Sequence, residues 1–201
     1  MNKSYLLALL LFFSMAAKAQ DEEEAKGGFK KENLFTGGGI SLSLSNYSFL
    51  VGASPVLGYR LADWADAGLV LNYQYNSLRD YPYIDYKQRQ NIYGGGVFTR
   101  LFPVRFVFAQ AQFEHNFISQ KVIYPSGGGT EHYNTSANSL LIGLGYMQGR
   151  MPGFNSASYY LSLLWDVSGN SNSPYTDSRG RTIPILRGGV NIPLFQGRSG
   201  Y

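Results

Sequence analysis

The two histidines are the residues of this sequence best suited to acid–base chemistry. His115 directly follows Glu114 and lies four residues before Ser119, so one short segment offers an acid, a base and a hydroxyl nucleophile. Catalysis would need these groups within hydrogen-bond reach of one another. Neighbouring side chains of a β-strand point to opposite faces, which would separate Glu114 from His115. We therefore expect no catalytic residue here or at the second histidine, His132.

Cofactor, metal and nucleic-acid sites find no support either. The sequence has no cysteine, which excludes disulfides, thiolate metal sites and cysteine nucleophiles. Gly127-Gly128-Gly129 is not followed by the helix and lysine of a phosphate-binding loop. The net charge of +4 comes from scattered basic residues rather than a basic patch, so nucleic-acid binding is not expected. We expect no cofactor and no metal.

The N-terminus has the pattern of a secretory signal. Lys3 precedes an apolar stretch at residues 5–15, and Ala17-Lys18-Ala19 is a small-x-small cleavage site. The apolar stretch is too short to span a bilayer as a helix. We expect a cleaved signal peptide at residues 1–19 and a disordered periplasmic tail at residues 20–33.

The remaining chain alternates between apolar and polar residues. Charged residues make up only 15% of the sequence, against about a quarter in a typical soluble domain. In the segment 107–117, Gln110, Gln112 and Glu114 share one face while alanine, phenylalanine and histidine share the other. This period of two is typical of β-strands. The polar face is made of Gly, Ser, Asn and Gln with few charges, which favours a narrow interior over a water-exposed surface.

The alternation predicts eight strands, each long enough to cross a bilayer at a tilt. They are expected at residues 35–45, 48–61, 66–77, 90–102, 104–119, 137–148, 157–168 and 182–195. Short connections at 62–65, Phe102-Pro103 and 149–156 alternate with longer ones at 78–89, 120–136 and 169–181. The connection at Asn46-Tyr47 is short and departs from this alternation. The prediction is an all-β fold, an eight-stranded antiparallel up-and-down transmembrane β-barrel over residues 34–201.

Aromatic residues near the predicted strand ends would suit the membrane interface, where Trp and Tyr place a polar group in the headgroups. These residues are Phe35, Phe49, Tyr59, Trp64, Tyr73, Tyr75, Phe102, Phe117, Tyr146, Phe154, Trp165 and Phe195.

Five charged residues fall on the predicted inner face: Arg60, Arg100, Glu114, Asp166 and Arg187. An arginine facing lipid at the midplane would cost about 2–4 kcal/mol, so these side chains should point inward and pair. Eight strands enclose little more than their own side chains. We expect an ion-pair plug that fills the lumen; the alternative is a proton or ion path through it.

The connection at 78–89 is the richest recognition surface. Its candidate contact residues are Arg79, Asp80, Tyr81, Tyr83 and Tyr86. Tyrosine supplies a large contact area at low entropic cost. The alternative is that these rings simply lie in the lipid headgroups.

Four segments carry a resemblance to a known family. They are Gly37-Gly38-Gly39-Ile40-Ser41-Leu42, Pro55-Val56-Leu57-Gly58-Tyr59-Arg60-Leu61-Ala62-Asp63, Gly96-Val97-Phe98-Thr99-Arg100 and Arg187-Gly188-Gly189-Val190-Asn191. Over residues 34–195 the chain resembles the small outer-membrane β-barrel proteins of Bacteroidota, which share the OmpA/OmpX architecture. Such barrels usually end with the last strand and a terminal aromatic, whereas here residues 196–200 separate Phe195 from Tyr201. Either the last strand runs on to Tyr201 or the aromatic signal is internal.

The resemblance implies location in the outer membrane of a Gram-negative envelope after export. It also implies contact with outer-membrane lipids and lipopolysaccharide, and with the barrel-assembly machinery during biogenesis. We expect a non-enzymatic protein that is structural or binds a ligand or partner through its extracellular loops. One alternative is an enzyme that modifies lipid A in the outer leaflet, because some eight-stranded barrels do so with His, Ser and an acidic residue. A second alternative is a soluble, lipocalin-like barrel, which would have an apolar interior and a charged exterior.

Overall fold

The computed structural model describes residues 29–44, 48–79, 85–125, 128–150, 156–176 and 181–195. The expected signal peptide at residues 1–19 lies outside the described residues, as do residues 20–28 of the expected tail. A 3-10 helix, η1, occupies Lys31–Asn33 just before the first strand. The strands that follow are β1 Leu34–Leu44, β2 Ser48–Ala62, β3 Ala65–Arg79, β4 Lys87–Val104, β5 Val107–Ile123, β6 Thr130–Gln148, β7 Ser158–Asp166 and β8 Ile185–Pro193.

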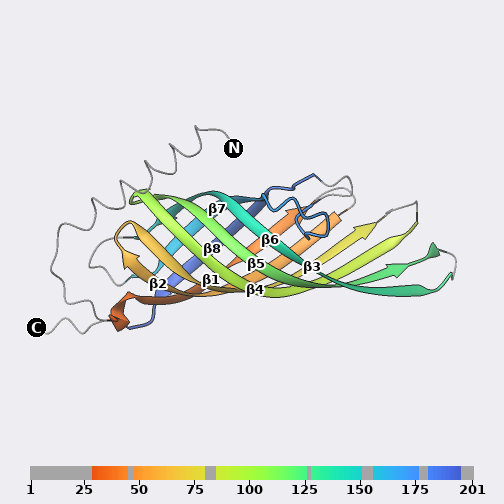
Figure 1. Ribbon diagram of the computed structural model, residues 1–201, viewed down its shortest axis with the longest axis horizontal. Coiled ribbons are helices and arrows are strands. Elements are labelled where there is room, and N and C mark those ends of the chain that lie inside the picture. Colours follow the sequence, from red (N-terminus) through yellow and green to blue (C-terminus); the bar gives the residue numbers. More distant parts are fainter. Residues whose placement is uncertain are drawn as a thin grey trace, which may run out of the picture. The chain divides into compact units, whose positions relative to one another are not determined.

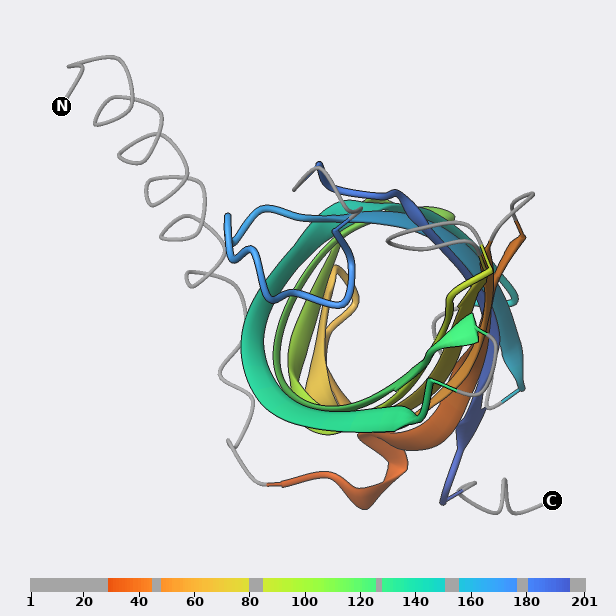
Figure 2. The ribbon, with the colours of Figure 1, turned by 90° about the vertical axis from the view of Figure 1, so that its right-hand side faces the viewer.

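The eight strands form a closed barrel. Each strand pairs antiparallel with the next in sequence, and β8 pairs with β1 to complete the ring. The strands run obliquely around the barrel (Figure 1), and the view along it shows the ring of ribbons (Figure 2). The predicted all-β fold of eight antiparallel, sequentially paired strands is confirmed. Closure satisfies the strand edges that an open sheet would leave unpaired.

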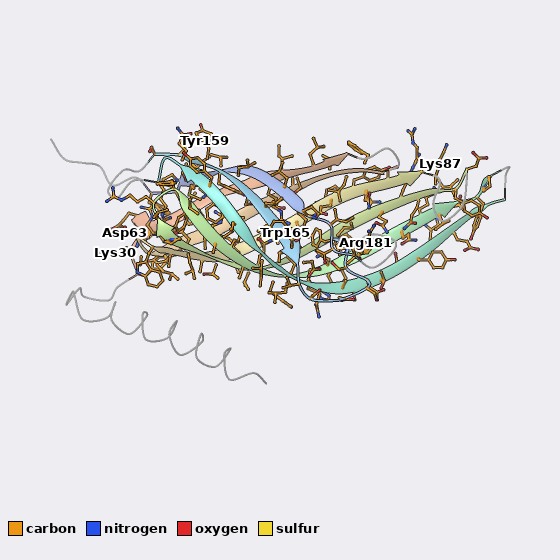
Figure 3. The ribbon with its side chains drawn as sticks, turned by 90° about the horizontal axis from the view of Figure 1, so that it is seen from above. Lys30, Asp63, Lys87, Tyr159, Trp165 and Arg181 are labelled. Atoms are coloured by element: carbon orange, nitrogen blue, oxygen red, sulfur yellow. The ribbon has the colours of Figure 1, made fainter. Side chains whose placement is uncertain are left out.

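The two faces of the wall differ in chemistry. Along β7, inward residues are buried and outward residues are exposed at every step. The exterior is apolar, with Leu71 64% and Leu144 62% exposed, whereas Glu114 and Gln74 of the interior are fully buried. Figure 3 shows the outward side chains along the barrel, with Asp63 at one end and Lys87 at the other. The period of two in the sequence therefore predicted which side chains face inward.

Glycines make room for aromatic rings inside the barrel. A Cβ atom added at Gly145 would lie 2.2 Å from Cζ of Phe108, and one at Gly58 would lie 2.1 Å from Cζ of Phe35. Phe35 and Phe102 were expected at the membrane interface, but both are buried inside, 7% and 5% exposed. The glycine wall opposite a large ring keeps the interior packed without widening the barrel.

Three strands are much longer than a bilayer requires. β4, β5 and β6 have 18, 17 and 19 residues, against the roughly 9–11 that a tilted transmembrane strand needs. Together with β3 they project beyond the short strands β7 and β8 at one end of the barrel (Figure 1). We call this projecting part of β3–β6 the outer extension.

The extension corrects two predicted loops. Residues 120–136 were expected to form a loop, but β5 and β6 stay paired up to Ile123 and Thr130. The expected loop at 78–89 shortens in the same way, because β3 continues to Arg79 and β4 starts at Lys87. At the opposite end, the turn expected at Phe102-Pro103 lies instead at Arg105-Phe106, because β4 continues to Val104.

Candidate functional site

Glu114 is the centre of a hydrogen-bonded network in the barrel interior. Its Oε1 atom lies 3.2 Å from Nη2 of Arg187, which comes from β8 on another part of the wall. Its carboxylate also accepts hydrogen bonds from Gln112 and Asn116, its inward neighbours on β5. Because side chains alternate along β5, both amide side chains face the barrel interior beside Glu114. Two of the five predicted lumen charges thus form an ion pair.

Tyr175 joins this network from outside the strands. It lies in the connection between β7 and β8, yet it is only 2% exposed. Its hydroxyl donates to Oε2 of Glu114 at 2.6 Å and accepts from Nε2 of Gln74 at 2.9 Å. Nη2 of Arg187 also lies 3.4 Å from the hydroxyl. Sequence reasoning placed this segment in an outer loop and did not identify Tyr175.

Asp166 holds the same connection in place at the end of β7. Its Oδ2 atom accepts a hydrogen bond from Ser173, and its Oδ1 accepts from the backbone N–H groups of Leu140 and Ser168. Ser173 also lies within hydrogen-bond distance of Ser139 Oγ at 3.0 Å. Figure 2 shows the connection, in blue, folded across the barrel mouth. Asp166 was expected in the ion-pair plug; within the described residues it acts through hydrogen bonds instead.

The guanidinium of Arg100 is surrounded by three aromatic rings inside the barrel. Its guanidinium carbon lies 4.4 Å from the ring centroid of Tyr160, 4.9 Å from that of Phe98 and 5.2 Å from that of Phe108. Nε donates to Gln110 at 2.9 Å, and Gln110 in turn donates to Gln112 at 2.7 Å. A cation over aromatic faces is stabilised by the ring quadrupoles. The polar ladder of β5 thus connects Arg100 to Glu114.

A second ion pair closes the end of the barrel that has the short turns. Nη1 of Arg150 lies 2.6 Å from Oδ2 of Asp66, and Nη2 donates to the carbonyls of Ala62 and Asp63. The guanidinium also covers the ring of Phe102 at 3.9 Å. Arg150 follows β6 and was not predicted as an interior residue. Arg60 was predicted as an interior residue. It is half-buried and lies opposite Asp66 in the β2–β3 pairing.

The geometry around His115 is not that of a catalytic site. His115 points outward, where Nδ1 lies 2.6 Å from Oδ1 of Asn138 and the ring contacts Phe117 edge-on. Glu114 is inside the barrel, bonded to Arg187. In the part of the chain that the structure describes, no group of three or more His, Asp or Glu residues could hold a metal ion.

Tyrosines surround a carboxylate at the tip of the outer extension. Tyr124 donates to Glu131 at 2.7 Å, Tyr133 donates to the same oxygen, and the ring of Tyr86 contacts that of Tyr124 edge-on at 5.3 Å. The bond to Glu131 raises the pKa of Tyr124 to about 12, and the two donated bonds lower the pKa of Glu131. We call these four residues the tyrosine cluster.

Two of the five predicted recognition residues, Arg79 and Tyr86, lie among the described residues. Arg79 ends β3 on its outward face, and Tyr86 belongs to the tyrosine cluster. Asp80, Tyr81 and Tyr83 lie outside the described residues. Tyr124, Glu131 and Tyr133 were not singled out from the sequence, because residues 120–136 had no strand periodicity to place them.

Comparison with known proteins gives structural neighbours. The chain is similar to the N-terminal β-barrel domain of OprF from Pseudomonas aeruginosa, with TM-score 0.41, 15% identity, and coverage of 80% of this chain and 97% of that one. It is also similar to Neisserial surface protein A (TM-score 0.42, 14% identity, 80% and 95% coverage). A third neighbour is the outer membrane protein Ail of Yersinia pestis, with TM-score 0.43, 12% identity, and coverage of 79% of this chain and 97% of that one.

No protein-family model matches the chain, and a comparison with curated proteins gives no match. TM-scores below 0.5 and identities of 12–15% are too low to transfer a function. The eight-stranded closed barrel is established by the strand pairing of this chain itself. Among the described residues, there is no helix with the length and apolar character needed to cross a membrane.

Proposed function

We propose that this chain is an integral outer-membrane β-barrel with a plugged lumen, which acts without catalysis by presenting its outer extension to a ligand or partner. The observation that carries the proposal is the apolar exterior of the barrel. Its most exposed large side chains include Ile40, Leu71, Leu144 and Tyr159, at 67%, 64%, 62% and 64%. Soluble monomers rarely expose contiguous apolar surface of more than a few hundred Å².

The distribution of charge supports a lipid environment over the soluble alternative. A lipocalin-like barrel would carry apolar side chains inside and charges outside. Here Glu114, Arg100 and Arg187 are buried inside, and aliphatic side chains cover the outside. This is the inverted arrangement that a barrel in hydrocarbon requires. Outer-membrane lipids would surround the apolar band, and the barrel-assembly machinery would insert it.

The burial of the inner side chains supports a plugged lumen. A continuous water channel would leave the side chains that line it exposed to solvent. Glu114, Asn116 and Gln74 are 0% exposed, and Arg100 and Arg187 are 2% and 3% exposed. Tyr175 fills the space between them from the β7–β8 connection. We therefore expect no solute conduction.

The strand lengths support an outward role for the extension. Outer-membrane barrels have short turns on the periplasmic side and longer segments on the cell surface. The turns at Asp63-Trp64 and Arg105-Phe106 would face the periplasm, and the tyrosine cluster would face outward. Tyrosines around one exposed carboxylate would form an amphipathic contact surface.

The lipid A-modifying alternative lacks geometric support. Its acid, Glu114, is committed to Arg187 and Tyr175 inside the barrel, while His115 faces outward. The assignment to the Bacteroidota type stays a prediction from the sequence.

Fractionation of cells that express the protein, followed by gel electrophoresis of heated and unheated samples, tests the membrane proposal. We expect recovery in the outer membrane and a mobility that changes on heating. Recovery in the soluble periplasm would overturn the proposal. Conductance across a planar bilayer tests the plug, and discrete open-channel currents from the wild-type protein would contradict it.

The recognition role needs a separate test. We would place a photo-crosslinking amino acid at Tyr124 or, as a matched control, at Tyr159 on the apolar exterior, in intact cells. We expect discrete protein or saccharide adducts from position 124 and only lipid adducts from position 159. Equal adduct patterns at the two positions would remove the extension from the proposed function.

A further inference from the structure

The outward face of the extension carries basic residues that oppose one another across the strands. Arg79 of β3 lies directly opposite Lys87 of β4, and Arg89 of β4 lies opposite Lys121 of β5. Lys121 in turn lies opposite His132 of β6. We call these five residues the basic row. They share the outward parity of Tyr73, Tyr93 and Phe117 further down the same strands.

Such pairing is unfavourable without a counter-charge. Directly opposite side chains on one face of an antiparallel pair have Cβ atoms about 4.5–5.5 Å apart, and like charges there are destabilising. Within the described ranges, no member of the row forms an ion pair; those pairs are Arg150–Asp66 and Arg187–Glu114. The carboxylate of Glu131 is bonded to Tyr124 and Tyr133 on the other face of β6. A bound anion would relieve this repulsion.

The position of the row indicates where that anion lies. Arg89 is four residues beyond Tyr93, and Lys121 is four residues beyond Phe117. Four residues span about 13 Å along a strand, which becomes about 10 Å of height at a tilt near 40°. Interfacial aromatics lie at the level of the lipid headgroups. Long Arg and Lys side chains extend back toward the interface, so their charges reach the lipid phosphates.

Neutral hydrogen-bond donors complete this face. Ser77 lies opposite Arg89, and Asn91 lies opposite Ser119, all with outward parity. A phosphate ester needs both charge and donors, and the arginine fork matches two of its oxygens at once. Lysine contributes a point charge beside it.

We propose that the basic row binds the phosphate groups of anionic lipids in the leaflet that surrounds the barrel, with Arg89 and Lys121 as its central contacts. The inference rests on the proposed membrane location and adds the site through which that leaflet is recognised. Bound lipid would tie the extension down to the membrane surface and fix the height of the tyrosine cluster above it.

The test is a titration of the purified barrel in uncharged detergent with diphosphoryl lipid A, followed by native mass spectrometry. The variant is R89Q/K121Q, which removes both central charges. One control is the swap R89K/K121R, which keeps them, and another is R105Q, an exposed arginine at the opposite end of the barrel. We expect R89Q/K121Q to bind diphosphoryl lipid A about thirtyfold more weakly. Both controls should bind it like the wild type.

Two outcomes would overturn the inference. One is equal affinity of the wild type and R89Q/K121Q for diphosphoryl lipid A. The other is displacement of the lipid by millimolar inorganic phosphate, which would make the row a site for free anions. Heat-dependent gel mobility is measured on the same samples. A wild type that inserts but shows equal affinities refutes this inference alone, whereas a soluble wild type refutes the proposed function.

Discussion

The hydroxyl of Tyr175 donates a 2.6 Å hydrogen bond to Oε2 of Glu114, which joins the β7–β8 connection to the inner face of β5. The two residues are 61 positions apart in the sequence. Through this contact, Tyr175 of the β7–β8 connection becomes part of the barrel interior. Because the donor is in the β7–β8 connection and the acceptor is in β5, the bond should stabilise the connection and the barrel wall together.

Tyr175→Phe should destabilise the barrel measurably. The substitution keeps the ring but removes the donor to Glu114 and the acceptor for Gln74. Loss of a hydrogen bond to a buried charged group costs about 1–3 kcal/mol. Urea unfolding in lipid vesicles, followed by tryptophan fluorescence, would measure the loss as a lower midpoint.

Tyr159→Phe is the matched control, because Tyr159 is 64% exposed on the barrel exterior. We expect its unfolding midpoint to stay near that of the wild type. If Tyr175→Phe unfolded at the same urea concentration as Tyr159→Phe, the hydrogen bonds of the Tyr175 hydroxyl would contribute nothing to stability.

Glu114 and Arg187 should be energetically coupled. Removing one partner of a buried ion pair leaves an uncompensated charge and costs about 3–5 kcal/mol. Glu114→Gln should therefore destabilise strongly, and Arg187→Met as well. The double variant should lose less free energy of unfolding than the sum of the two, because it leaves neither charge unpaired. Additive losses in this double-mutant cycle would argue against the pair.

Gly145→Ala should disturb the packing of Phe108. The new Cβ would meet Cζ of Phe108 at 2.2 Å, so the ring must move. Overpacking of this kind costs about 1–3 kcal/mol. Gly188→Ala is the control, because its Cβ would meet Leu161 only at 3.7 Å. A second substitution, Phe108→Leu, should restore part of the loss in Gly145→Ala; failure to do so would place the strain elsewhere.

The alternation of the sequence was sufficient to predict the fold and the inner face. Gln110, Gln112 and Glu114 point inward because side chains of a strand alternate, and no tertiary information is needed to see it. The same parity could have placed Phe102 correctly, since it lies two residues from the inward Arg100. The prediction instead placed Phe102 at the membrane interface because aromatic residues are common at strand ends, and this placement was wrong.

The rest of the site could not be read from periodicity. The connection with Tyr175 has no repeat, and its position depends on how the closed barrel brings β5 and β8 around it. Arg150 and Asp66 are 84 residues apart and meet only because the strands return to the same end. The outer parts of β5 and β6 lack the apolar face of the inner parts, as expected of a segment that projects into water on both sides.

Leu71→Arg should prevent stable insertion more than Ser77→Arg does. Both residues have the outward parity of β3, but Leu71 is in the apolar band and Ser77 is in the extension. An arginine at the bilayer midplane costs about 2–4 kcal/mol, and one near the interface costs about 0–1 kcal/mol. Refolding yields into vesicles, scored by heat-dependent gel mobility, would compare the two. Equal yields would contradict the membrane placement of this band.

Tyr124 should titrate at unusually high pH. Glu131 accepts a hydrogen bond from the hydroxyl of Tyr124, and this bond raises the pKa of Tyr124 to about 12. A group whose pKa is higher in the folded state contributes stability below its unfolded pKa, near 10 for tyrosine, and loses it as the pH rises toward the folded value. The contact should therefore be intact at neutral pH and lost between about pH 10 and 12.

The difference in tyrosinate absorbance between the wild type and Tyr124→Phe isolates this one hydroxyl. Its midpoint should lie near 12 in the wild-type background. In a Glu131→Gln background the midpoint of this difference should move toward the ordinary tyrosine pKa near 10, because the carboxylate that opposes ionisation is gone. Acid should also release the cluster, but only below the ordinary pKa of a glutamate, since the tyrosines lower the pKa of Glu131. A wild-type midpoint near 10 would mean that Tyr124 and Glu131 are not bonded, and the tip would then lack the fixed geometry on which the proposed recognition depends.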